Sequence, residues 1–298
     1  MANVKHLTKL KQGSANWTEW IKDGHHIELD LSHANLSGTN LSGMELVKAN
    51  LTGANLCDGE LMETDLSSAN LQTAELINAN LCQSNLSNAD LRFAYLIDAD
   101  LSNANLIGAD LRGASCRQVN LYRANLIGTS MRKINLSQAN LIEAQLNRTN
   151  LSEANLTGAN LNEADLTGAN LYEAESQSAN FYKANLYRVR AIAAHLSKSY
   201  FVRANLAEIR VTDSDLRWAN LSYANLRNAD CMRANLRGAN LINADLKGAN
   251  LAATNLRGVN FTKADLRGTN LAAADIEDAI FDKARLQGAI MPDGTKHF

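Results

Sequence analysis

The chain has 298 residues, of which 46% are hydrophobic and only 5% are aromatic, and its formal net charge at pH 7 is −2. That balance gives no overall surplus of positive charge of the kind that drives binding to nucleic acid. The first 11 residues lack the apolar stretch of a secretory signal, and no segment is long and apolar enough to span a membrane, so we expect a cytoplasmic protein without membrane contact.

The N-terminal segment 1–26 differs from the rest of the chain and predicts a short α-helical cap. Three apolar residues at helical spacing predict one face of a first helix, namely Val4, Leu7 and Leu10. Gly13 and Ser14 are expected to end that helix, because both favour breaks and turns.

A second helix is predicted to follow directly. Asn16, with Glu19 three residues later, has the pattern of an N-cap, and Trp17, Trp20 and Ile21 form an apolar face. We expect this face to cover the open end of the core that follows, because the first coil of a solenoid must be capped.

Residues 27–291 follow one five-residue pattern without insertion or deletion, and residues 292–298 form a tail. Every fifth residue from Leu31 to Met291 is a central position, and Leu occupies 41 of these 53 positions. The other 12 are Cys116, Met131, Ser176, Phe181, Ala191, Phe201, Val211, Cys231, Phe261, Ile276, Phe281 and Met291. A repeat this regular predicts a solenoid with one continuous core.

A period of five matches neither the 3.6 residues of a helical turn nor the alternation of a strand, so each repeat must contain a turn. The segment Leu-Ser-Glu-Ala-Asn-Leu-Thr-Gly-Ala-Asn-Leu, from Leu151 to Leu161, shows the order: a central Leu, two variable residues, Ala, then Asn or Asp. Gly recurs at the second variable position, for example Gly158, where it suits the positive φ of a type II turn.

Over residues 30–291 this repeat resembles the pentapeptide-repeat family, whose pattern is A-(D/N)-L-X-X. The resemblance implies an all-β solenoid, a right-handed quadrilateral β-helix with four repeats per coil, and hence about 13 coils for the 53 repeats. Four aromatic central residues, separated by 20, 60 and 20 positions, should then lie on one side of the coil: Phe181, Phe201, Phe261 and Phe281. The N-terminal pattern Gly-x-x-x-Trp-x-x-Trp resembles that of cyanobacterial members.

We expect no enzymatic activity, no cofactor and no metal. Asn, Ser, Thr and Gly fill most outer positions, and the chain has no phosphate loop, Gly-x-Ser-x-Gly or Cys-x-x-Cys motif. His25 and His26 could hold a metal, but no Cys or third His lies at ligand spacing, so a solvated loop is expected. The four cysteines fall on different columns of a 20-residue coil and predict free thiols: Cys57, Cys82, Cys116 and Cys231.

The repeat is least regular over residues 175–215, where charged and aromatic residues replace the usual Asn or Asp. Glu175, His195 and Asp215 should stack in one column. An acid–His–acid column resembles an active site, but a convex surface without a cleft favours contact over chemistry. We therefore predict a surface for a protein partner, with the candidate residues Tyr187, Arg190, His195, Tyr200, Arg203 and Arg210.

One irregularity of this segment lies in the core. Ala191 replaces the central Leu and should leave space in its column. Phe201, ten residues further on, lies on the opposite side of the same coil, and its ring is predicted to fill that space.

The C-terminal end should expose the edge of the last coil, because no helix follows to cover it. Ile280 and Ile290 replace the usual polar residue and should point outward. Either the tail folds back as a lid or two chains meet end to end, and family members that dimerise at this end favour a homodimer. The candidate contact residues are Ile280, Phe281, Ile290, Met291 and Phe298.

These features predict a non-enzymatic scaffold that binds another protein through an exposed β-helix face. The alternative is a DNA mimic that binds DNA gyrase, as some family members do. Residues 41–100 carry nine acids and two bases, a net charge of −7, whereas residues 216–270 carry eight bases and three acids, a net charge of +5. Acidity confined to one segment disfavours mimicry.

Binding of nucleic acid is a third hypothesis, because two basic ladders run along the C-terminal half. They lack interleaved aromatic residues, which disfavours this partner. The ladders consist of Arg217, Arg237 and Arg257, and of Arg227, Lys247 and Arg267.

Overall fold

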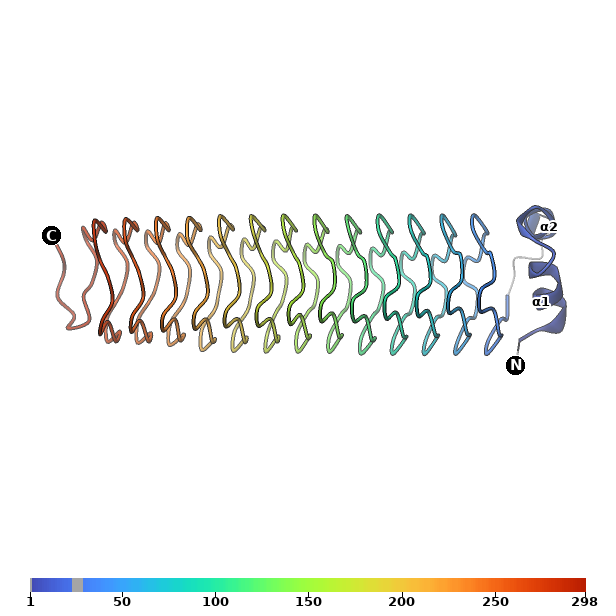
Figure 1. Ribbon diagram of the computed structural model, residues 1–298, viewed down its shortest axis with the longest axis horizontal. Coiled ribbons are helices and arrows are strands. Elements are labelled where there is room, and N and C mark those ends of the chain that lie inside the picture. Colours follow the sequence, from blue (N-terminus) through green and yellow to red (C-terminus); the bar gives the residue numbers. More distant parts are fainter. Residues whose placement is uncertain (1, 23–28) are drawn as a thin grey trace. The chain divides into compact units, whose positions relative to one another are not determined.

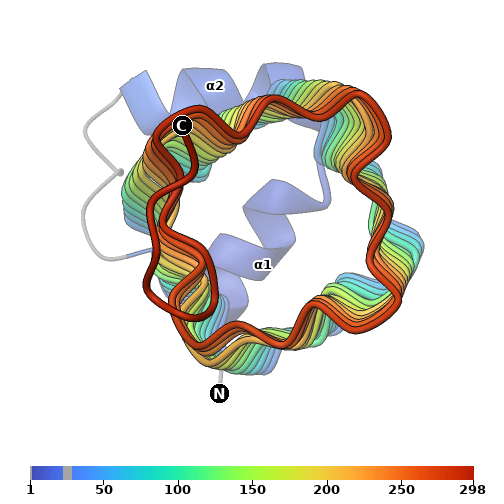
Figure 2. The ribbon, with the colours of Figure 1, turned by 90° about the vertical axis from the view of Figure 1, so that its left-hand side faces the viewer.

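The computed structural model describes residues 2–22 and 29–298 and divides into two compact units, residues 1–150 and 151–298. Each unit consists of stacked coils in which a residue forms a parallel β-bridge with the residue 20 positions further on (Figure 1). Four five-residue repeats therefore make one coil, and a view along the coils shows a closed, four-sided turn (Figure 2). The pairing consists of single bridges, such as Asn50 with Asn70, and no described segment forms an extended strand.

Backbone hydrogen bonds explain why a repeat of five residues is stable. In the N-terminal unit, Leu51 N donates to Asn70 O of the next coil at 2.7 Å, and Asn70 N donates to Ala49 O at 2.9 Å. Ala54 N donates to Leu51 O at 3.0 Å and closes a four-residue turn within the repeat. Neighbouring coils and the turn together satisfy the backbone polar groups that a buried chain must pair.

The second variable residue of each turn adopts a left-handed conformation, whether or not it is Gly. Gly158 has φ 66°, as the sequence predicts for a type II turn. However, 39 of the described residues other than Gly also have positive φ, all between 53° and 61°. Gly is thus favourable but not required, because the hydrogen bonds to neighbouring coils hold other residues in this conformation at a local cost.

Thr73 shows that cost most clearly, because it is β-branched and has φ 56°. Replacement Thr73→Gly should raise the free energy of unfolding by about 1 kcal/mol, since a left-handed backbone is unfavourable for a residue with a Cβ atom. Urea denaturation followed by circular dichroism measures the change. Ser87→Gly is the control, because Ser87 occupies the first variable position and lacks positive φ. This control should lower stability, and a loss of stability in both variants would contradict the prediction.

The central residue and the Ala two positions before it fill the interior, as predicted. Leu166 and Ala164 of the C-terminal unit, for example, are fully buried. The Phe181 and Phe201 rings stack with centroids 4.7 Å apart and planes within 5°. A second pair consists of Phe261 and Phe281, with centroids 5.2 Å apart. The stacking confirms that Phe residues 20 positions apart lie on one side of the coil, whereas the filling of space beside Ala191 by Phe201 stays a prediction.

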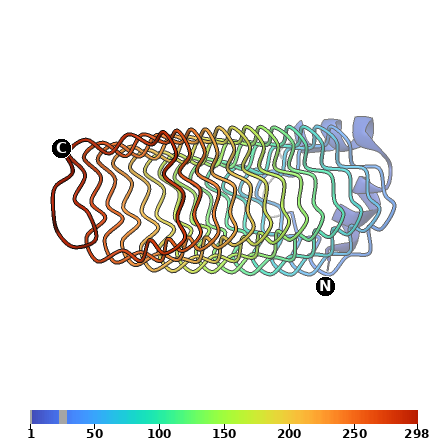
Figure 3. The ribbon, with the colours of Figure 1, turned by 60° about the vertical axis from the view of Figure 1, so that its left-hand side comes forward.

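Two helices, α1 (Val4–Leu10) and α2 (Ser14–Trp20), lie beside the first coils of the N-terminal unit (Figures 1 and 3). Viewed along the coils, α1 crosses the open end of the interior (Figure 2). Trp17 is fully buried, and its indole Nε1 donates to Glu45 O at 2.8 Å. Leu10, Trp20 and Ile21 are buried as well. The apolar residues of this segment are therefore buried, whereas the covering of the core by α2 stays a prediction.

Three details of this segment differ from the prediction. Ser14 begins α2 instead of breaking the helical run. Asn16 lies inside α2 and is not its N-cap, because Trp17 N already donates to Gly13 O and the Asn16 amide donates to Gln12 O. Val4 is 77% exposed, since the two-turn helix α1 buries only its last residue, Leu10. None of the helices within the described residues is long and apolar enough to cross a membrane.

The C-terminal tail folds back onto one side of the last coil. Met291 N donates to Thr295 O at 2.7 Å, and His297 N donates to Ala289 O at 2.8 Å. The lid alternative is therefore confirmed on this side, with an antiparallel bridge between Ile290 and Lys296. Elsewhere the end of the core stays partly open, because four central residues are only half-buried: Ile276, Phe281, Leu286 and Met291.

Candidate partner-binding surface

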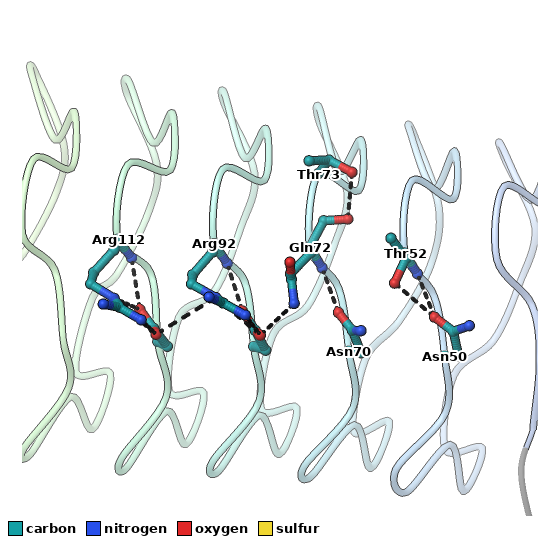
Figure 4. A network of polar contacts seen from close by, with 9 residues as sticks. Asn50, Thr52, Asn70, Gln72, Thr73, Arg92 and Arg112 are labelled. Atoms are coloured by element: carbon teal, nitrogen blue, oxygen red, sulfur yellow. Dashed lines mark hydrogen bonds and ion pairs between the residues drawn. The ribbon is translucent and has the colours of Figure 1, made fainter.

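A ladder of side-chain amides covers the regular parts of the β-helix surface. Asn205 Nδ2 donates to Asn185 Oδ1, and Asn225 Nδ2 donates to Asn205 Oδ1, both at 2.9 Å. Each Oδ1 also accepts from a backbone amide two residues on, as between Asn50 and Thr52 in the N-terminal unit (Figure 4). Replacement of such an Asn by Arg therefore adds a charge to the surface and removes a hydrogen-bonding side chain from the ladder.

Arg190 and Arg210 replace this ladder on one side of the C-terminal unit. They form a parallel bridge with each other, and both side chains are exposed. Among the described residues, neither guanidinium has a hydrogen bond or an ion pair. Two like charges at directly neighbouring positions repel each other. An anionic group bound here would remove that repulsion.

Tyr187 lies at the corner that leads into the side of Arg190. Its hydroxyl donates to Glu208 Oε1 at 3.2 Å, and Arg188 Nε donates to Glu208 Oε2 at 2.7 Å. The guanidinium of Arg188 also lies 4.8 Å from the centroid of the Tyr187 ring. These contacts hold the Tyr187 ring in place at a corner three residues before Arg190.

The predicted column of Glu175, His195 and Asp215 is confirmed by parallel bridges between successive members. His195 Nε2 lies 3.7 Å from Glu175 Oε1. Two hydrogen bonds from Arg217 lower the pKa of Asp215 below its usual range, and burial opposes this shift. Asp215 is thus held by Arg217, and the column is a ladder of polar side chains on the surface.

The six candidate residues do not lie on one face. Columns five residues apart occupy successive sides of a coil, so Arg190, His195 and Tyr200 lie on three different sides. Arg203 follows at the next corner, with its guanidinium 5.9 Å from the Tyr223 ring. Arg190 and Arg210 are therefore brought together, Tyr187 lies at the corner before Arg190, and His195, Tyr200 and Arg203 are distributed around the coil.

Metal binding and thiol chemistry depend on the His, Cys, Asp and Glu side chains of residues 2–22 and 29–298, the described part of the chain. No group of three or more His, Cys, Asp or Glu side chains there could hold a metal ion, and His25 and His26 lie outside the described residues. All four cysteines are free, as predicted. Burial raises the pKa of both Cys116 and Cys231 to about 12, which keeps these two thiols protonated and unreactive.

Most cations of the two basic ladders are already paired with carboxylates. Arg217 binds Asp215 at 2.7 Å, and Arg227 binds Asp245 at 2.6 Å. Three other ladder residues also form ion pairs with carboxylates: Lys247, Arg257 and Arg267. Among the described residues, Arg237 alone in these ladders has no ion pair. The pairing weakens the case for nucleic-acid binding along the ladders.

One aromatic residue lies beside the first ladder, although no series of aromatic rings is interleaved with the cations. Trp218 follows Arg217 directly, is 59% exposed, and lies over Gly238 of the next coil. The sequence carries a signal for this arrangement that period analysis missed: Arg-Trp at 217–218 is followed 20 residues later by Arg-Gly at 237–238.

Asp265 gives a pH-dependent contribution to stability. Two hydrogen bonds of 2.8 Å from Arg267 lower its pKa from 3.8 to about 2, and Lys247 adds to the shift. Because the folded-state pKa is depressed, the contribution is complete above about pH 4 and disappears as the pH falls through 2. Asp265→Asn should therefore cost up to about 2 kcal/mol at pH 7 and almost nothing at pH 2.

Urea denaturation at both pH values measures this difference. Asp282→Asn is the control, because Asp282 is exposed and its side chain has no hydrogen bond or ion pair within the described residues. It should change little at either pH. A loss for Asp265→Asn that is equal at pH 7 and pH 2 would show that packing, and not charge, is responsible.

Comparison with known proteins agrees with this architecture. The family model for pentapeptide repeats matches in eight copies, over residues 28–61, 64–103, 99–138, 134–171, 179–217, 214–252 and 254–291. The chain belongs to the pentapeptide-repeat family, whose fold is a right-handed quadrilateral β-helix. A comparison with curated proteins gives no match.

Three solved structures illustrate the similarity. HetL, a protein involved in heterocyst differentiation regulation from the cyanobacterium Nostoc sp. strain PCC 7120, is 30% identical over 94% of this chain and 98% of its own, with a TM-score of 0.32. Full-length QnrB1, a plasmid-mediated fluoroquinolone resistance protein, is 16% identical over 64% of this chain and 90% of its own, with a TM-score of 0.33. Rfr23 from the cyanobacterium Cyanothece 51142 is 24% identical over 46% and 86%, with a TM-score of 0.23.

Proposed function

We propose that this protein is a non-enzymatic cytoplasmic scaffold that binds a protein partner through one side of the C-terminal unit. The surface consists of Tyr187, Arg190 and Arg210. The observation that carries this proposal is the pair of neighbouring, exposed guanidinium groups, neither of which forms an ion pair with any described residue. Membership in a family whose members are generally structural or interaction proteins supports it.

The chemistry of this surface specifies an acidic partner segment. Arg190 and Arg210 can each bind a carboxylate through two parallel hydrogen bonds, and the aromatic ring of Tyr187 adds a rigid contact at the corner. His195, Tyr200 and Arg203 belong to the same proposed site only if the partner also wraps around the adjoining sides of the coil.

The double replacement Arg190→Asn and Arg210→Asn tests the proposal, because Asn is the ordinary residue at these positions and should preserve the fold. The matched control is Lys263→Asn with Lys283→Asn, which removes two exposed cations that are also 20 residues apart. Quantitative pull-downs should recover a partner with the wild type and the control but lose it with the Arg double variant. Recovery of the same proteins with all three chains would refute this surface.

The alternative function, a DNA mimic that binds DNA gyrase, is tested separately by a supercoiling assay. We expect no inhibition, because the acidic segment 41–100 is not continued in the rest of the chain. Inhibition that survives the Arg190/Arg210 replacement would favour the DNA mimic over the scaffold.

We further propose a homodimer through the part of the C-terminal end that the tail leaves open. Ile280 is 49% exposed and Ile290 is 39% exposed, so both point outward, and Phe298 is 97% exposed. Phe281 and Met291 are half-buried at the same end. Apolar residues at an open edge favour contact with a second copy across a two-fold axis. We also propose that the β-helix has about 13 coils, because four repeats make one coil and the sequence contains 53 repeats.

Light scattering distinguishes the dimer from a monomer closed by the tail. The wild-type chain should have twice the monomer mass at high protein concentration. The double variant Ile280→Asn and Ile290→Asn should be monomeric at the same concentration, because it removes apolar area from the contact. A wild-type chain that stays monomeric would overturn the dimer and leave the tail as the complete lid.

A further inference from the structure

Trp218 forms one wall of a small surface pocket in the C-terminal unit. A Cβ atom at Gly238 would approach the indole atoms Cε3 and Cζ3 to 2.3 Å, so the ring lies directly on the backbone of that glycine. The other face of the ring remains accessible, since the residue is 59% exposed. The pocket has a volume of about 200 Å³ and is lined by Trp218, Arg237, Gly238, Arg257, Gly258 and Asp278.

The cations around this pocket differ in what they can bind. Asp215 holds Arg217, and Asp275 and Glu277 hold Arg257. Arg237 has no such partner among the described residues and is exposed. The pocket therefore offers one accessible aromatic face, one free guanidinium and one carboxylate, that of Asp278.

We propose that this pocket binds a nucleoside monophosphate. The base stacks on the accessible face of Trp218, and the phosphate accepts two hydrogen bonds from Arg237. Asp278, as an acceptor, faces an amino group on the edge of the base. One indole and about 200 Å³ suit one base, whereas a nucleic-acid strand would need a series of stacking rings.

A related construction occurs in the N-terminal unit. Phe93 lies over Gly113, where an added Cβ would meet the ring at 2.7 Å, and the pocket there has a volume of about 210 Å³. Four cations line it: Arg92 and Arg112, which are bound to Asp90 and Asp110 (Figure 4), and also Arg132 and Lys133. The Trp218 pocket differs from it in its larger indole ring and in the carboxylate of Asp278, which lines the pocket.

Tryptophan fluorescence tests the proposal on the full chain. Trp17 and Trp20 are buried, so quenching by an added ligand reports on Trp218. AMP should quench the emission saturably, adenosine more weakly, and inorganic phosphate not at all. Arg237→Asn should weaken AMP binding about tenfold and leave adenosine unchanged, because only the phosphate contact is lost. Asn already occupies the first variable position at Asn162, so the fold should tolerate it.

Two matched variants control for charge and backbone strain. Lys263→Asn removes an exposed cation outside the pocket and should leave AMP binding unchanged. Gly238→Ala should displace the indole and abolish binding, whereas Gly268→Ala, with a similar positive φ and no atom within 4 Å of the new Cβ, should not. Absence of saturable quenching by millimolar AMP, equal losses in Arg237→Asn and Lys263→Asn, or unchanged binding in Gly238→Ala would each overturn the proposal.

Discussion

Phe201→Ala is expected to lower the free energy of unfolding by about 3–5 kcal/mol, the range for removal of a fully buried aromatic side chain. The ring is completely buried and stacks on Phe181 with centroids 4.7 Å apart. The variant would lose this contact and leave a cavity in a coil where Ala191 already replaces the larger Leu. Backbone hydrogen bonds between neighbouring coils limit how far the walls of the cavity can move inward. The cavity should therefore not close fully.

Urea denaturation followed by circular dichroism measures the effect. Phe93→Ala is the control, because Phe93 is 59% exposed and its loss should change stability by less than about 0.5 kcal/mol. Phe201→Leu restores the common central residue and should cost less than about 1.5 kcal/mol. Equal midpoints for Phe201→Ala and Phe93→Ala would refute the assignment of Phe201 as a core residue that determines stability.

Trp17→Ala should cost the N-terminal unit a similar amount, about 3–5 kcal/mol. The substitution removes a fully buried indole from α2 and leaves the Glu45 carbonyl without its 2.8 Å hydrogen bond. The first coils would then lose their cover, and apolar area of the core would contact water.

Hydrogen exchange locates this effect along the chain. Amides of residues 31–50 should exchange faster in Trp17→Ala, because opening of the first coils no longer requires displacement of the indole. Val4→Ala provides the control within the same segment, since Val4 is 77% exposed and should leave exchange unchanged. Uniformly faster exchange throughout residues 31–150 would mean that Trp17 stabilises the whole unit instead of its end.

The register of the fold was predictable because one requirement repeats at every coil. A central Leu must face inward, and the 20-residue spacing of Phe181 and Phe201 reveals how many repeats close a coil. The conformation of the turn was only partly predictable. Sequence suggests Gly at a left-handed position, but it does not show that pairing with neighbouring coils also holds residues such as Thr73 there.

The candidate site was less predictable because closeness in sequence is not closeness on this surface. Arg190 and His195 are five residues apart and therefore lie on adjacent sides, whereas Arg190 and Arg210 are 20 apart and pair directly. The Trp218 pocket was missed for a related reason. The pocket forms because the indole of Trp218 packs on the next coil and not on the preceding one. In the sequence, only Gly238 indicates this choice, because a residue without a side chain leaves room for the ring.

Because a coil contains four equivalent repeats, the gain or loss of one repeat moves every later residue to the adjacent side of the coil, which is a quarter turn. Central residues would remain central, so the core could still close. Loss of residues 196–200, however, would leave Arg190 and Arg210 15 positions apart, on adjacent sides instead of in one column. Single-repeat insertions and deletions can thus rearrange a fixed set of outer side chains among four sides while the interior keeps its chemistry.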